Sequence, residues 1–275
     1  MVISVFTDEI NREDPARALA LVAAWGVTHV EARSLPGGRF PAVADAELAD
    51  FHAQVRDAGL KVSAVSPGFF KCAIDDPAVD RGLSEGLPRA CEWAQRWGTD
   101  LVSCFGFRRG DAARVPAEVV DRLGEMADIA MRGGCRLALE NEAVCWGDTG
   151  LEVAEILRQV GADRMTLCWD PGNSAKAGSA CPFPDEYEQL KDLVIHLHVK
   201  NYVLDTGEWE VAEQGIVDWP GQFLALRADG YDGFAVVETH LRTRSGALGT
   251  ADSDLSGLEA NTYRNLEFVR SCLGQ

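Results

Sequence analysis

The chain has few histidines and few basic residues for its length. Its 275 residues include five His and 26 Lys or Arg against 43 Asp or Glu, which gives a formal net charge of −17 at pH 7. A surface of this sign repels the phosphate backbone of nucleic acids and the anionic face of a membrane, so we expect neither as a partner. Small-molecule chemistry is favoured instead.

Long apolar runs and paired cysteines are also missing. No apolar run approaches the roughly 20 residues that a membrane-spanning helix needs. The first residues, MVISVFTDEI, carry no basic segment of the kind that opens a secretion signal, so we expect a cytoplasmic protein. The eight cysteines are scattered singly without a CxxC pair, which disfavours a disulfide framework and a thiolate zinc site.

A glycine-rich phosphate-binding turn is absent after the first apolar run. The residues that leave this run, FTDEINRED, contain no glycine. A dinucleotide-binding fold needs glycines there so that the backbone can approach the pyrophosphate. The sequence therefore disfavours an open doubly wound sheet with a dinucleotide site.

Short apolar runs alternate with helical segments along the whole chain. The eight runs are VISVFT, VTHVEA, KVSAVS, DLVSCF, RLALEN, MTLCWD, VIHLHV and FAVVET. Between them, segments such as 15–26, 45–59 and 117–134 place apolar residues at three- and four-residue spacing and end in Gly, as helices do. With no Pro/Gly/Ser-rich linker, the pattern predicts an α/β fold: a single (β/α)8 TIM barrel that forms one domain over residues 1–275. The long connections at 202–218 and 242–254 are candidate lids.

Each of the last four apolar runs ends on a side chain that binds metal ions. Glu140 ends RLALE, Asp170 ends MTLCWD, His198 ends VIHLH and Glu238 ends FAVVE. An ionised group on a buried strand is tolerated only when it is paired, hydrogen-bonded or bound to a cation. Because the carboxyl ends of barrel strands meet on one face, we predict one shared site. Three carboxylates and an imidazole suit a divalent ion such as Mn²⁺, Mg²⁺, Co²⁺ or Zn²⁺.

These strings together resemble the xylose-isomerase-like TIM-barrel superfamily of sugar isomerases and epimerases, the sugar phosphate isomerase/epimerase family. The resemblance covers nearly the whole chain, from FTDEI and WGVTHVEARS through LALENE, CWDPGNS, HLHVKN and QGIVDW to VVETH. It implies that Glu140, Asp170, His198 and Glu238 hold one divalent ion, with Mn²⁺ as the first choice. It also implies a small-molecule sugar or keto-sugar as the substrate. Many relatives form dimers or tetramers, so a homo-oligomer is considered, although no contact surface is identified.

The chemistry implied by the resemblance is proton abstraction next to a carbonyl. Glu140 and Glu238 would act as an acid/base pair on opposite faces of one substrate carbon. A metal-stabilised enediolate would then lead to isomerisation or epimerisation of a sugar, keto-sugar or cyclitol. The alternative is a lyase on the same barrel, either an inosose-type dehydratase or an enzyme of 3-keto-glycoside β-elimination, because both begin with the same proton abstraction.

Two of the proposed ligands have a similar residue two positions away. We prefer Glu140 to Glu142 as the ligand because Glu140 ends the apolar run directly. The resemblance favours His198 as the ligand, which leaves His196 as a substrate-binding residue or as a partner of a ligand.

The sequence departs from ketose 3-epimerases at two positions. Those enzymes place a histidine three residues after the strand-six aspartate, where this chain has Asn173, and an arginine a few residues past the ligand histidine, where this chain continues KNYVLD. We therefore expect Asn173 and Lys200 among the substrate-binding residues. Lys200 is able to neutralise an enolate oxygen or bind an acidic substrate, and the alternative is that it pairs with Asp170 or Glu238.

Further candidate substrate-binding residues follow other apolar runs. They are Lys71 after SPGFF, and His240 and Arg242 in ETHLR. An exposed rim position is the ordinary alternative for Lys71. Glu31 and Arg33, at the end of VEARS, are expected either to form a buried ion pair or to contact substrate.

Two further classes of function use the same barrel. A zinc-dependent nuclease is disfavoured because it needs many histidines and a basic face, whereas this chain has five histidines and a charge of −17. A non-catalytic sugar-binding barrel would keep the pocket but would have no need of a divalent ion.

Overall fold

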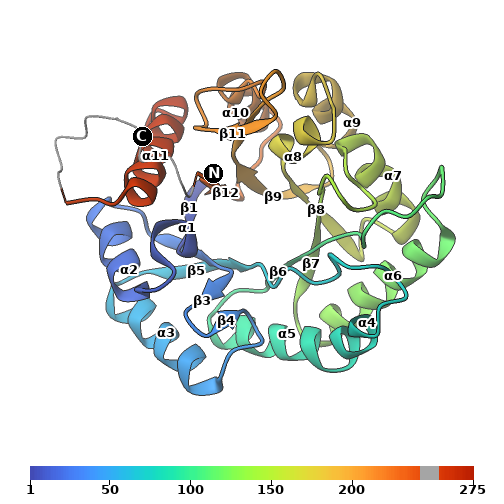
Figure 1. Ribbon diagram of the computed structural model, residues 1–275, viewed down its shortest axis with the longest axis horizontal. Coiled ribbons are helices and arrows are strands. Elements are labelled where there is room, and N and C mark those ends of the chain that lie inside the picture. The colour runs from blue at the N-terminus through green and yellow to red at the C-terminus, as the bar shows by residue number, and fades with distance from the viewer. Residues whose placement is uncertain (242–253) are drawn as a thin grey trace.

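Eight parallel strands form a closed barrel in the computed structural model, which describes residues 1–241 and 254–275 (Figure 1). The strands follow one another around the barrel in the order β1-β12-β9-β8-β7-β6-β5-β2. Their bounds are β1 Val2–Phe6, β2 His29–Ala32, β5 Lys61–Val65, β6 Leu101–Cys104, β7 Arg136–Glu140, β8 Met165–Trp169, β9 Val194–Val199 and β12 Phe234–Val237. Each coincides with one of the eight apolar runs, so the predicted (β/α)8 barrel is confirmed.

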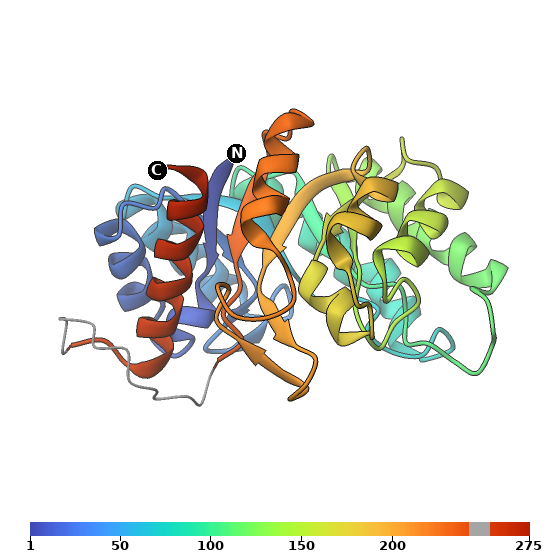
Figure 2. The same cartoon turned by 90° about the horizontal axis from the view of Figure 1, so that it is seen from above.

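Helices surround the barrel on its outside, as Figures 1 and 2 show. The longer ones are α2 Pro15–Ala24, α3 Asp45–Asp57, α5 Leu87–Arg96, α6 Ala117–Arg132, α7 Gly150–Val160, α10 Trp219–Ala228 and α11 Gly257–Leu273. The shorter ones are α1 Asp8–Asn11, α4 Ala78–Arg81, α8 Pro171–Lys176, α9 Tyr187–Leu190 and the π-helical turns η1 Gly82–Gly86 and η2 Pro182–Glu186. None of the described helices is long and apolar enough to cross a membrane.

Side-chain alternation along the strands separates an outer apolar core from the barrel interior. In β7, Leu137 and Leu139 belong to the large core shared with the helices, whereas Ala138 belongs to a small separate cluster. Because strand side chains alternate between the two faces, Glu140 shares the inward side of Ala138. This alternation directs a carboxylate into the mouth of the barrel.

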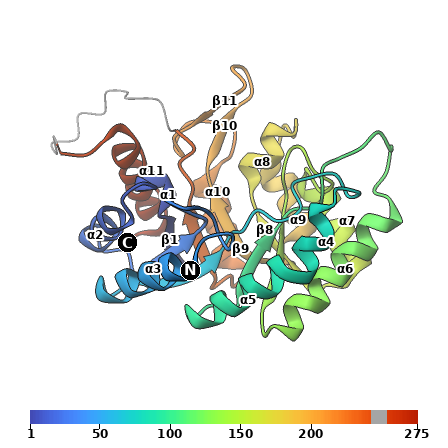
Figure 3. The same ribbon diagram turned by 60° about the horizontal axis from the view of Figure 1, so that its bottom comes forward.

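Two hairpins lengthen the connections after strands, and the sequence pattern gave no prediction of either. The strands β3 Ser34–Leu35 and β4 Gly38–Arg39 pair after β2, and β10 Asn201–Val203 pairs with β11 Glu208–Glu210 after β9. The second hairpin falls in the predicted lid at 202–218 and projects from the barrel (Figure 3). Of the other predicted lid, 242–254, only Asp254 lies within the described residues.

Hydrogen bonds from the Asn201 side chain hold together the two ends of the segment that contains the β10–β11 hairpin. Its buried side-chain amide donates to the carbonyl oxygens of Ala212 and Val217 at 2.9 and 3.1 Å, and its Oδ1 accepts from the amides of Tyr202 and Val217 at 2.9 and 3.0 Å. One side chain thus satisfies both ends of a long connection, which a buried backbone requires.

Replacing Asn201 by Ala should lower the free energy of unfolding by about 2–4 kcal/mol, because several buried backbone groups lose their partners. Asn201→Asp keeps the acceptor oxygen but turns a second, negatively charged oxygen toward the Ala212 and Val217 carbonyls, so it should cost at least as much. Urea denaturation of both variants measures the difference. Equal stability of Asn201→Ala and the wild type would contradict this role.

Candidate metal centre and active site

The four side chains predicted to share a site do converge. Ligand atoms of Glu140, Asp170, His198 and Glu238 lie within 4.8 Å of one another, and all four residues are buried. Glu140 ends β7, Asp170 follows β8, His198 lies in β9 and Glu238 follows β12. The carboxyl ends of four barrel strands therefore build one cluster at the mouth.

Asp170 is held so that one carboxylate oxygen faces the cluster. Its Oδ1 caps helix α8 by accepting from the Asn173 amide at 2.9 Å. The side chain of Asn141 clamps the Asp170 backbone, accepting from its amide at 2.8 Å and donating to its carbonyl at 2.7 Å. Of the two carboxylate oxygens of Asp170, only Oδ2 faces the other three side chains of the cluster. The Asx-Pro start of α8 thus fixes the direction of this oxygen.

His198 is oriented by a carboxylate behind it. Its Nε2 lies 3.2 Å from Oε1 of Glu31, and its Nδ1 lies 3.3 Å from Oε1 of Glu140 and 3.7 Å from Oε2 of Glu238. Carboxylates commonly orient metal-binding imidazoles in this way. Burial alone would lower the pKa of His198, but Cys168, Glu140 and Glu31 raise this pKa well above its ordinary value.

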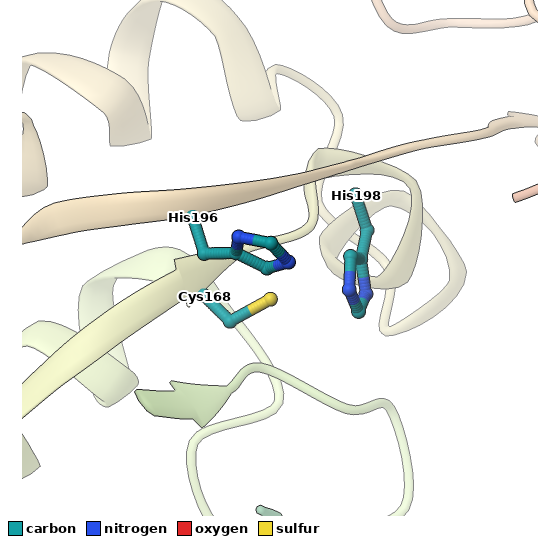
Figure 4. A group of neighbouring side chains, drawn as sticks. All are labelled: Cys168, His196 and His198. Carbon is teal, nitrogen blue, oxygen red and sulfur yellow. The ribbon is translucent and has the colours of Figure 1, made fainter. Parts of the chain in front are cut away.

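His196 lies beneath the cluster. Its Nε2 is 2.6 Å from Oε2 of Glu31, and its ring lies edge-on to that of His198. Figure 4 shows Cys168 from β8 and both histidines from β9 turned toward one another. His196 is fully buried and does not line the pocket described below, so of its two predicted roles the position suits a partner of a ligand better than a substrate contact.

Lys200 places its ammonium beside two of the carboxylates. Its Nζ lies 2.7 Å from Oδ2 of Asp170 and 2.9 Å from Oε2 of Glu238. Gly172 makes this approach possible, since a Cβ there would come within 2.9 Å of the Lys200 side chain. Burial raises the pKa of Asp170 to about 6, with Glu140 and Glu238 adding to the rise and Lys200 opposing it.

Arg33 balances the negative charge of a second group of carboxylates. Its guanidinium is ion-paired with Asp8, Glu9 and Glu238, with a distance of 2.6 Å from Nη1 to Oε1 of Glu238. Burial would raise the pKa of Glu238, but Lys200, His240 and Arg33 outweigh it and hold this pKa well below its ordinary range. Glu31 and Arg33 thus pair with other residues instead of with each other.

A cavity of about 360 Å³ opens onto the cluster. Its walls include Phe6, Phe105, Ser66 and Arg39 besides Glu140, His198, Lys200 and Glu238. A larger hollow of about 920 Å³ lies at the other end of the barrel, where the strands begin, and is lined by residues such as Lys61 and Arg136. Because barrel enzymes work at the carboxyl ends of their strands, the smaller cavity is the candidate substrate pocket.

The remaining predicted substrate-binding residues differ in their access to this pocket. Lys71 and His240 line it; Nζ of Lys71 pairs with Glu142 at 2.7 Å, and Nδ1 of His240 lies 3.2 Å from Oε1 of Glu238. Asn173 is buried away from the lining, where its amide donates to Glu140 at 3.2 Å. Arg242 lies outside the described residues.

Sequence reasoning missed Arg39 and left the role of Glu142 open. Arg39 lines the pocket from the β3–β4 hairpin, and Glu142 lines it from the turn after β7. The glycine- and proline-bearing stretch LPGGRFP was the available signal for a hairpin at the rim. Nothing in that stretch indicated that its arginine would turn into the barrel mouth.

The donor set fits a divalent cation. Nδ1 of His198 is buried without a hydrogen-bond partner, and Oδ2 of Asp170 has no partner besides the ammonium of Lys200. Three carboxylates and one imidazole around a common point are the ligand types that Mn²⁺, Mg²⁺ and Zn²⁺ take up in proteins. Among the described residues, Lys200, Arg33 and the histidines offset much of the buried negative charge.

Comparison with known proteins shows what the chain is similar to. No functionally curated protein matches it. Among solved structures, D-psicose 3-epimerase from Clostridium cellulolyticum H10 with D-tagatose has a TM-score of 0.74 at 18% identity, covering 99% of both chains. A xylose isomerase-like TIM barrel protein from Mycobacterium smegmatis in complex with magnesium has a TM-score of 0.71 at 19% identity, covering 99% of this chain and 97% of that one. The probable 3-DHS dehydratase of petrobactin synthesis from Bacillus anthracis has a TM-score of 0.72 at 16% identity, covering 100% and 99%.

At these identities the solved structures establish the barrel alone. The family described as "Xylose isomerase-like TIM barrel" matches residues 19–272, which is most of the chain. The protein therefore belongs to the xylose isomerase-like TIM barrel family.

Proposed function

We propose that the protein is a divalent-metal-dependent isomerase or epimerase that acts on a sugar, keto-sugar or cyclitol. The observation that carries this proposal is the meeting of Glu140 and Glu238 with Asp170 and His198 within 4.8 Å at the floor of a pocket. The similar structures include a 3-epimerase with a bound ketose and a family member in complex with magnesium, which supports a sugar substrate and a divalent ion.

Glu140, Asp170, His198 and Glu238 would hold the ion. When bound, it supplies Lewis acidity that stabilises negative charge on substrate oxygens next to the reacting carbon. We take Mn²⁺ as the first candidate. Lys200 shares oxygens with this site, so its ammonium must leave Asp170 or Glu238 when a cation enters, and it then becomes available to a substrate oxygen.

Glu140 and Glu238 are the proposed acid/base pair. One carboxylate takes the proton from the carbon next to the carbonyl, and the other, in its protonated form, returns a proton to the opposite face of that carbon or to its neighbour. The two residues come from β7 and from the end of β12, with β8 and β9 between them in the barrel. They therefore approach a substrate at the centre of the mouth from different sides.

A lyase is the second candidate, supported by the similarity to a probable dehydratase. The same carboxylate would take the carbon-bound proton, and a hydroxyl on the next carbon would leave as water after receiving a proton. His240 is placed to donate it, since this residue lines the pocket with its Nδ1 3.2 Å from Glu238.

Proton exchange at carbon tests the proposal directly. The Mn²⁺-loaded protein, incubated with a panel of ketoses and inososes in D₂O, should place deuterium on the carbon next to the carbonyl, as mass spectrometry and NMR detect. Glu140→Gln and Glu238→Gln should each slow the exchange about a hundredfold or more. Retention of all substituents indicates isomerisation, and an unsaturated product indicates elimination.

Glu186→Gln is the matched control for these two variants. Glu186 is a buried glutamate that accepts from the Gly150 amide at 2.6 Å, away from the pocket, so exchange should persist. Absence of exchange with every substrate of the panel would contradict the enzymatic proposal.

Ion binding gives a second test that does not depend on turnover. Titration calorimetry with Mn²⁺ should show at least about tenfold weaker binding for Asp170→Asn and His198→Ala than for the wild type. His52→Ala, at a half-buried histidine in α3 outside the cluster, is the control. Unchanged affinity in both ligand variants would place the ion elsewhere.

Lys200→Met should bind Mn²⁺ more tightly than the wild type, because the competing ammonium is gone from Asp170 and Glu238. The same variant should lose proton exchange if Lys200 serves a substrate oxygen. Weaker Mn²⁺ binding by Lys200→Met in the calorimeter would contradict the competition.

A further inference from the structure

Among the described residues, four Lys or Arg side chains line the pocket, and three of them form ion pairs with carboxylates. Arg33 pairs with Asp8, Glu9 and Glu238, while Lys71 pairs with Glu142 and Lys200 pairs with Asp170 and Glu238. Arg39 differs from them. Within the part of the chain that the structure describes, it forms no ion pair, and its one hydrogen bond runs from Nε to the Pro67 carbonyl at 3.2 Å.

Arg39 nevertheless packs against the segment that follows β5. Its guanidinium lies against Gly68, where a Cβ would come within 2.8 Å of Nη2 and 3.0 Å of Cζ. Gly68 has a φ of +72°, a conformation that glycine adopts without strain. The contact with Pro67 uses Nε. The Nη groups, which form the fork that binds carboxylates and phosphates, have no hydrogen bond among the described residues.

The surroundings of Arg39 make an anionic partner favourable. Solvent reaches the side chain, yet burial by the surrounding walls and repulsion from Arg33 lower the pKa of Arg39 to about 10. The group stays charged at neutral pH, and the carboxylates that attract it, those of Asp8, Glu140 and Glu238, form no ion pair with it. Because the whole chain carries a net charge of −17, an anionic small molecule depends for attraction on local cations such as Arg39.

We propose that Arg39 is an anion-binding residue of the substrate pocket, so that the substrate is a ketose or cyclitol derivative that carries a carboxylate or a phosphate. The identity of the sugar-like part rests on the proposed function, whereas the anion site rests on Arg39 itself. The β3–β4 hairpin then acts as a specificity element, because it brings Arg39 to the same cavity as Glu140 and Glu238.

Titration calorimetry of the Mn²⁺-loaded protein tests this proposal with matched ligands. The probes are D-fructose, its uronate D-fructuronate, and D-fructose 1- and 6-phosphates. We expect at least one anionic probe to bind about tenfold or more tightly than D-fructose, since a charge-assisted bidentate contact is added. A preference for the uronate identifies a carboxylate, and a preference for a phosphate ester identifies a phosphate.

Variants of Arg39 then test whether this residue causes the tighter binding of anionic probes. Arg39→Gln should abolish it without weakening the binding of D-fructose, and Arg39→Lys should keep part of it. Arg12→Gln is the control, because Arg12 also donates from Nε to a backbone carbonyl, that of Leu35, but does not line the pocket. Equal affinity for charged and neutral probes, or a preference that survives Arg39→Gln, would overturn the proposal.

Failure of the anion site and failure of the proposed reaction give different results. If neutral ketoses exchange deuterium and Arg39→Gln changes no affinity ratio, the reaction stands and the anion site is wrong. If an anionic probe binds in an Arg39-dependent way while no substrate of the panel exchanges deuterium, the anion site stands and the isomerase proposal is wrong.

Discussion

The site depends on positive charges and hydrogen bonds that balance the negative charge of the carboxylates buried at the mouth of the barrel. Glu31, Glu140, Asp170 and Glu238 are all nearly inaccessible to solvent. Ionised groups in such places cost several kcal/mol each unless opposite charges and hydrogen bonds replace the lost water. Arg33 and Lys200 supply two of the opposite charges, and both contact Glu238. A divalent cation bound to the cluster would balance more of this negative charge.

The need to balance buried charge explains why further polar residues lie behind the proposed ligands. Glu31 accepts from Ser66 and faces the Nε2 atoms of His196 and His198, so the imidazole that faces the cluster cannot rotate freely. On the other side, Asn141 and the α8 amide of Asn173 fix Asp170. His198 and Asp170 thus each have neighbouring residues that set their direction, as metal centres with a defined geometry require.

Two hairpins place side chains beside this cluster at the mouth of the barrel. The β10–β11 hairpin brings Trp209 within about 5 Å of both the Lys200 ammonium and the His240 ring. The β3–β4 hairpin contributes Arg39. Barrel enzymes commonly vary their loops while the strands stay constant, because the loops contact only part of the core. In the proposed enzyme, the reaction and the choice of substrate would depend on different elements.

The sequence alone determined the barrel and the group of four candidate ligands. Apolar runs that each end on Glu140, Asp170, His198 or Glu238 leave few alternatives, since strand periodicity and the convergence of parallel strands are local and general rules. The pairing of Arg33 with Asp8 and Glu9, the burial of His196 and the position of Arg39 came only from the tertiary structure. These contacts join residues from different strands and hairpins, and their geometry follows from packing across the barrel, which no local sequence pattern encodes.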